Sequence, residues 1–207
     1  MMHKLLFLSA LLLTQAYGAL TPEESLQRLI EGNKRFLADE STHPDRTSER
    51  RQETAELQEP FATILGCADS RVAPEIIFDQ GIGDLFIVRV AGNVSGPIEL
   101  DSIEYSVLYL HSSLIVVLGH ENCGAVKAVL HGQTKDIEAV AELIEPAVKK
   151  TKGETKNRLE STIQMNAKMV AESLRKSPVL SRFIKEKKLD IVAGYYDFHE
   201  GKVKILK

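Results

Sequence analysis

Short apolar runs alternate with segments of helical periodicity along most of this chain of 207 residues. The runs at 61–66, 85–90 and 114–118 are almost entirely aliphatic or aromatic, which is typical of strands that are buried on both faces. A fourth run at 189–194 has the same character. A turn precedes 203–206, which we predict to be an antiparallel edge strand.

The segments between these runs predict helices. Thr21, Pro22 and Glu24 form a start signal, because threonine caps a helix, proline suits its first position and glutamate completes a capping box. In a later helix at 98–110 we expect Ile98 to face the core with three other apolar residues. The remaining predicted helices are a short turn from Pro74 towards Phe78 and the segments 124–131, 137–148, 159–174 and 178–185.

Strand alternating with helix predicts an α/β fold. We expect a mainly parallel central sheet with one antiparallel edge strand, flanked by helices, and a helical N-terminal arm at 21–38. The apolar face of that arm needs a partner surface, either in its own domain or in a second subunit. Ligand sites in such sheets lie beyond the carboxyl ends of the strands, where Cys67, 91–93 and the pair His120–Cys123 all fall.

The first eighteen residues differ from the rest. Lys4 is followed by the apolar run 5–13, and Ala16-Tyr-Gly18 supplies small residues for cleavage. This is the pattern of a secretory signal peptide. The alternative is a membrane anchor, but the run is about half of the ~20 residues that a spanning helix needs. The sequence therefore predicts cleavage after residue 18, a single domain at 19–207, and a periplasmic or secreted protein without a membrane anchor.

The overall charge limits the choice of partners. Charged residues make up 27% of the chain, and the formal net charge is −3. A nucleic-acid partner would need a basic face, and an anionic membrane surface would as well. We therefore expect a small-molecule substrate.

The chain has two cysteines, Cys67 and Cys123. In an oxidising compartment two cysteines usually form a disulfide, and two small buried hydrophobic residues are a further possibility. Neither a disulfide nor a pair of buried hydrophobic residues explains the presence of His120, which lies three residues before Cys123. Two thiolates and one imidazole suit zinc, and three protein ligands with one open position are the catalytic pattern.

A carboxylate and a guanidinium follow the first cysteine, at Asp69 and Arg71. An isolated pair of this kind is usually an ordinary salt bridge. Beside a metal ligand we expect a functional role, in which Arg71 holds the carboxylate off the zinc so that it accepts a hydrogen bond from zinc-bound hydroxide. If the pairing breaks, Asp69 becomes the fourth ligand and closes the site. Activity should then rise with pH as hydroxide displaces the carboxylate.

These residues resemble the motifs of the β-class carbonic anhydrases. Cys67-Ala-Asp-Ser-Arg71-Val resembles the first motif, Gly119-His120-Glu-Asn-Cys123-Gly resembles the second, and 79–93 is similar to the stretch between them. The resemblance implies reversible hydration of CO₂ to bicarbonate and a proton. It implies one Zn²⁺ per chain on Cys67, His120 and Cys123, with Asp69 and Arg71 as the catalytic dyad. It also implies a homodimer or a dimer-based homo-oligomer, with the N-terminal arm embracing the partner.

Two other functions stay open on the sequence. The same zinc site could hydrolyse a CO₂-like molecule such as CS₂. A non-catalytic zinc-binding or disulfide-stapled module is the second alternative. Substrate competition separates the first from CO₂ hydration, and metal content with thiol titration separates the second.

Overall fold

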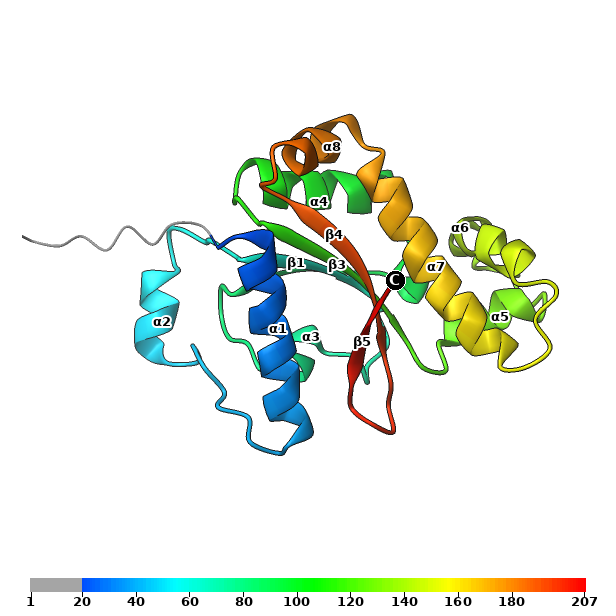
Figure 1. Ribbon diagram of the computed structural model, residues 1–207, viewed down its shortest axis with the longest axis horizontal. Helices are drawn as coiled ribbons and strands as arrows, with labels where there is room; N and C mark the ends of the chain where they lie inside the picture. Colours follow the sequence, from blue (N-terminus) through cyan, green and yellow to red (C-terminus); the bar gives the residue numbers. More distant parts are fainter. Residues whose placement is uncertain (1–19) are drawn as a thin grey trace, which may run out of the picture.

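The computed structural model describes residues 20–207, so the predicted signal peptide lies outside the described residues. Five strands form one sheet in the order β2-β1-β3-β4-β5 (Figure 1). The first four are parallel and β5 is antiparallel to β4, which confirms the predicted α/β class and its antiparallel edge. The strands are β1 (Ala62–Gly66), β2 (Leu85–Arg89), β3 (Leu114–His120), β4 (Asp190–Tyr196) and β5 (Val203–Leu206).

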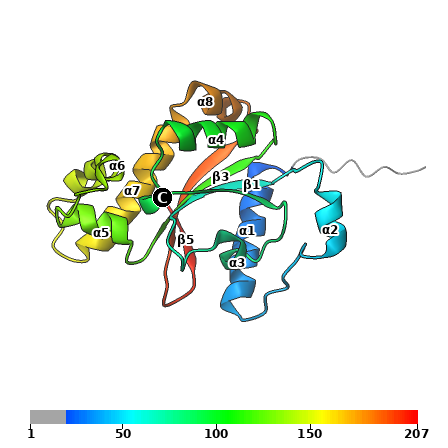
Figure 2. The same ribbon diagram turned by 180° about the vertical axis from the view of Figure 1, so that it is seen from behind.

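Helices cover both faces of the sheet, as Figures 1 and 2 show from opposite sides. One face carries α1 (Pro22–Leu37) and α3 (Pro74–Ile77). The other carries α4 (Pro97–Leu108), α7 (Arg158–Arg175) and α8 (Pro178–Lys185). The remaining elements are α2 (Ser48–Glu53), the short 3₁₀ turn Ala91–Asn93, α5 (Gly124–Leu130) and α6 (Glu138–Lys150).

Successive residues of the central strands point to opposite faces, so each strand serves two cores. In β3, Ile115 and Val117 pack towards α4 and α7. Leu114, Val116 and Leu118 of the same strand pack towards α1 and α3. Every residue of β3 is buried, which explains why this strand reads as a continuous apolar run.

The prediction for Ile98 was wrong. Its side chain is 78% exposed, whereas Ile103 and Val107 are buried as expected. At about 100° per residue, Ile98 lies about 140° around the helix from Ile103. It therefore falls on the solvent side of α4.

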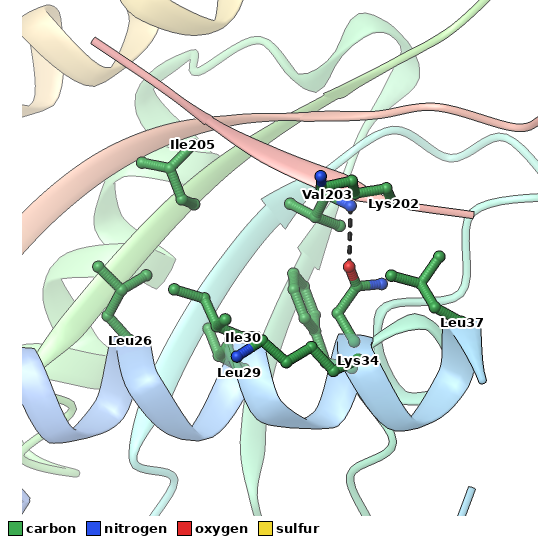
Figure 3. A pocket seen from close by; sticks show the side chains of 10 residues that line it. Leu26, Leu29, Ile30, Lys34, Leu37, Lys202, Val203 and Ile205 are labelled. Carbon is green, nitrogen blue, oxygen red and sulfur yellow. Dashed lines mark hydrogen bonds between the residues drawn. The ribbon is translucent and has the colours of Figure 1, made fainter. Parts of the chain in front are cut away.

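The N-terminal helix α1 packs on its own domain. The predicted capping box is present, with reciprocal hydrogen bonds between Thr21 and Glu24. Leu29 is 1% exposed. The amide of Asn33 donates to the carbonyl of Gly201 and accepts from the backbone N–H of Val203 at 2.9 Å. Figure 3 shows the apolar side chains of α1 facing β5. Packing of α1 on its own domain is thus present, as one of the two surfaces that the sequence allowed.

A buried carboxylate ties this N-terminal part to the segment that follows α3. Asp79 is 1% exposed. It accepts hydrogen bonds from the Arg35 guanidinium at 2.6 Å and from the backbone N–H groups of Thr42 and His43. Burial opposes ionisation of Asp79, but these donors outweigh it and lower its pKa to about 2. The ionised form is therefore the one that anchors the segment.

We expect Asp79→Asn to lower the free energy of unfolding at neutral pH by about 2–4 kcal/mol, because Arg35 loses its buried charge partner. The lowered pKa means that the carboxylate stabilises the fold above its unfolded value of about 4. That stability is lost as pH falls towards about 2. Denaturant unfolding between pH 2 and 7 should show a shallower pH dependence in the variant. Asp39→Asn, at an exposed position, is the matched control and should resemble wild type.

None of the helices within residues 20–207 is long and apolar enough to cross a bilayer.

Candidate metal centre

Three side chains that are far apart in the sequence meet at the carboxyl edge of the sheet. Cys67 directly follows β1, His120 is the last residue of β3, and Cys123 immediately precedes α5. Since β1 and β3 are parallel neighbours, their carboxyl ends lie together. The potential ligand atoms of the three residues lie within 4.8 Å of one another, and the two Sγ atoms are 4.0 Å apart. All three side chains are buried.

The imidazole of His120 is oriented by the backbone. Its Nδ1 lies 2.9 Å from the carbonyl oxygen of Glu121. A carbonyl only accepts, so Nδ1 carries a proton and Nε2 is the ring nitrogen left to bind another group. Nε2 is fully buried and has no hydrogen-bond partner among the residues that the structure describes. A metal ion beside the two thiols would supply the missing partner, so the donor set fits a thiophilic cation.

The two thiols influence each other's ionisation. A hydrogen bond from Cys123 lowers the pKa of Cys67 well below its usual range, assisted by His120 and by the backbone N–H of Gly92, while burial opposes ionisation. The same contact and burial raise the pKa of Cys123. One thiolate therefore forms easily and the second does not. A divalent cation between them would favour both thiolates.

Asp69 and Arg71 form a two-point ion pair beside this cluster. Arg71 donates from Nε to Oδ1 at 2.9 Å and from Nη2 to Oδ2 at 2.8 Å. These hydrogen bonds hold the pKa of Asp69 well below its usual range, although burial opposes them. Oδ2 lies 3.9 Å from His120 Nε2. The carboxylate thus lies next to the three donors but outside the compact group that they form.

Two further groups support the loop after β1. Arg89, at the end of β2, donates to the carbonyl oxygens of Cys67 at 2.9 Å and Asp69 at 2.5 Å. The backbone N–H of Gly92 lies 3.3 Å from the Sγ of Cys67. Gly92 has φ of +72°, and a Cβ there would lie 2.7 Å from Cδ1 of Ile144. Glycine therefore allows this backbone N–H to reach the sulfur.

The carbonic anhydrase family model matches residues 62–203, which include every residue of this centre. The chain belongs to the β-class of the carbonic anhydrase family. Carbonic anhydrase 2 of Mycobacterium tuberculosis is 40% identical over 191 residues, covering 87% of this chain and 91% of the relative. The carbonic anhydrase of Pseudomonas aeruginosa is 30% identical over 196 residues, covering 87% of each chain.

Comparison with solved structures supports the same family. The β-carbonic anhydrase CcaA aligns with a TM-score of 0.71 at 25% identity, covering 88% of this chain and 95% of that one. A Coccomyxa β-carbonic anhydrase in complex with acetazolamide aligns with a TM-score of 0.68 at 27% identity, covering 87% and 86%. The chain is a carbonic anhydrase, and its reaction is the hydration of CO₂.

Sequence reasoning about this carbonic anhydrase placed 91–93 at this edge but did not predict the contact between Gly92 and Cys67, and it missed Arg89. The position of Arg89 at the end of a predicted strand could have indicated it, because parallel strand ends share one edge. The contact of Gly92 is made by the backbone, which no residue type reveals. Asn93, the last residue of the segment 91–93 that we expected at this edge, is fully buried. His111, His131 and His199 are exposed.

Proposed function

We propose that Cys67, His120 and Cys123 bind one Zn²⁺ per chain and that this centre carries out the reversible hydration of CO₂ to bicarbonate and a proton. The observation that carries the proposal is the unpartnered Nε2 of His120, which faces two thiols inside a cluster no wider than 4.8 Å. Zinc, when bound, would supply a Lewis acid that makes water a stronger nucleophile.

We propose that Asp69 and Arg71 are the catalytic dyad. Arg71 fixes both carboxylate oxygens, so Asp69 stays ionised and can only accept hydrogen bonds. Its Oδ2 lies 3.9 Å from His120 Nε2, where it would accept a hydrogen bond from the reacting water and so orient the oxygen lone pair. A closed state with Asp69 as a fourth ligand would first have to break the contacts to Arg71.

Stopped-flow measurement of CO₂ hydration with a pH indicator, on protein of known zinc content, tests this function. We expect activity in proportion to bound zinc. CS₂ is the alternative substrate of such a site. If CS₂ were the true substrate, it would be hydrolysed efficiently and would inhibit CO₂ hydration competitively at low concentration, and that result would contradict the proposal.

We also propose a homodimer or a dimer-based oligomer that is exported after cleavage behind Gly18. Two solved relatives from Sordaria macrospora are described as tetrameric β-carbonic anhydrases. The apolar run and small residues before position 19 support export. Light scattering during gel filtration gives the subunit number. Sequencing the N-terminus of the mature protein tests the cleavage.

Removal of zinc should expose the two thiols to oxidation. The sulfur atoms are 4.0 Å apart, and a disulfide needs about 2.05 Å, so a small movement of the loop after β1 is enough. We expect aerobic chelation to produce a Cys67–Cys123 disulfide, with loss of both free thiols and of two hydrogen atoms in mass. Chelation without oxygen is the control. Two free thiols after prolonged aerobic chelation would contradict the prediction.

A further inference from the structure

The ring of Phe198 lies against both Arg71 and His120, and the function described so far gives this residue no role. The centre of the ring is 4.3 Å from Cζ of Arg71. The same ring centre is 5.4 Å from the centre of the His120 imidazole. One aromatic side chain therefore contacts a member of the proposed dyad and a proposed metal ligand at the same time.

The strand register explains how Phe198 reaches this place. His120 is opposite Tyr196 in the pairing of β3 with β4, and Phe198 follows in the loop that leads to β5. The backbone N–H of Phe198 donates to the carboxylate of Glu121 at 2.9 Å. The backbone N–H of Glu121 donates to the carbonyl of Tyr196 at 2.8 Å. These two hydrogen bonds fix the loop to the residue that directly follows His120.

The ring of Tyr196 fixes the orientation of the Phe198 ring. The two rings meet edge to face, with their centres 5.5 Å apart and an angle of 87° between their planes. This is a preferred arrangement of aromatic pairs. Tyr196 is itself buried at the end of β4, so it gives a rigid support. The position of the Phe198 ring is thus set by the sheet and not by Arg71.

Arg71 gains from such a support because its side chain is 55% exposed. An exposed ion pair is weakened by water, and holding a long side chain in one geometry costs rotamer entropy. A guanidinium is planar, so its edge can donate to a carboxylate while its face stacks on an aromatic ring. Arg71 does both, since Nε and Nη2 donate to Asp69 and Cζ lies over Phe198.

We propose that Phe198 is a positioning residue for the hydration of CO₂. Its ring attracts the Arg71 guanidinium and holds it in the orientation that donates to both oxygens of Asp69. The carboxylate is thereby kept beside the three metal-binding donors and not among them. This inference rests on the proposed role of the dyad. If Phe198 only filled space, leucine would serve as well, because it is also apolar and lacks only the aromatic face.

NMR of the Arg71 side chain in the intact protein tests the contact. The signal that disappears in Arg71→Lys identifies the Nε–Hε group of Arg71. In the wild type we expect nuclear Overhauser effects between Hε and the ring protons of Phe198. In Phe198→Leu, Hε should exchange with water about twofold to fivefold faster, the effect of losing one exposed cation–π contact on the opening of the ion pair. Phe198→Tyr keeps the aromatic face and should restore the wild-type exchange rate.

Phe183→Leu is the matched control. Cζ of Arg182 lies 5.0 Å from the centre of the Phe183 ring, so the same substitution removes the same kind of contact in α8, which contributes no residue to the metal centre. It should leave the exchange of Arg71 Hε and kcat unchanged. In Phe198→Leu we expect kcat to fall about twofold to fivefold at full zinc content, and in Phe198→Tyr we expect it to recover.

Equal exchange rates in wild type and Phe198→Leu would overturn the proposal. Absence of the Overhauser effects in the wild type would do the same without any substitution. Equal losses of kcat in Phe198→Leu and Phe183→Leu would show a general packing effect, and faster exchange without a change in kcat would remove Phe198 from the reaction. Full activity in Arg71→Lys would contradict the dyad and not the contact, because the NMR signals do not depend on activity.

Discussion

Cys67→Ser should lose zinc and CO₂ hydration together. A serine hydroxyl does not ionise readily and is a poorer ligand for zinc than a thiolate, so only His120 and Cys123 would still bind strongly. We expect zinc content to fall from one per chain to a small fraction. The rate of CO₂ hydration should fall about a thousandfold or more, because the proposed zinc would activate the nucleophilic water. Elemental analysis after gel filtration and stopped-flow assays on the same sample measure both quantities.

Ser70→Ala is the matched control for this variant. Ser70 lies in the same loop and is exposed, so its loss tests general disturbance of the loop rather than metal binding. It should keep full zinc content and activity. Far-UV circular dichroism of both variants shows whether the sheet is intact. Full zinc occupancy in Cys67→Ser would remove this residue from the ligand set.

Asp69→Asn should keep zinc but lose most activity. The carboxylate lies outside the compact donor group, so metal binding does not depend on it. An asparagine amide cannot accept hydrogen bonds at both terminal atoms, and it carries no charge for Arg71. We expect kcat to fall about a hundredfold, the size of the loss when a reacting group is no longer correctly oriented. Zinc content should stay at one per chain.

Arg71→Lys and Glu75→Gln are the comparison variants for Asp69→Asn. Arg71→Lys replaces a two-point contact with a single ammonium group, and we expect an intermediate loss of about tenfold. Glu75→Gln removes an exposed carboxylate a few residues later and should retain full activity. Loss of zinc from Asp69→Asn would show that the carboxylate is a required ligand. Unchanged kcat in that variant would remove Asp69 from the reaction.

The sequence predicts the central strands β1 and β3 well because they are buried on both faces. The apolar runs at β1 and β3 are buried along their whole length. For such a run it is not necessary to decide which residues face the core and which face solvent. Helix α4 is different, because its hydrophobic pattern is weak and its inward face must be inferred from a few positions. That is why Ile98 was placed on the wrong side.

The metal centre follows from the sequence for a topological reason. Cys67 and His120 each end a strand, and parallel neighbours bring such residues together whatever lies between them. The contacts that support this centre cannot be predicted from the sequence in the same way. The N–H of Gly92 and the two carbonyls that bind Arg89 are backbone groups, and they depend on loop conformations that residue types do not specify.

Zinc removal and readdition, followed in one preparation, test the central claim most directly. The protein is treated with a chelator without oxygen, its fold is checked by circular dichroism, and CO₂ hydration is measured before and after stoichiometric Zn²⁺ is added. We predict that activity disappears with the metal and returns in proportion to zinc, reaching its maximum at one ion per chain. Folded protein that is free of metal and still accelerates CO₂ hydration would contradict the account.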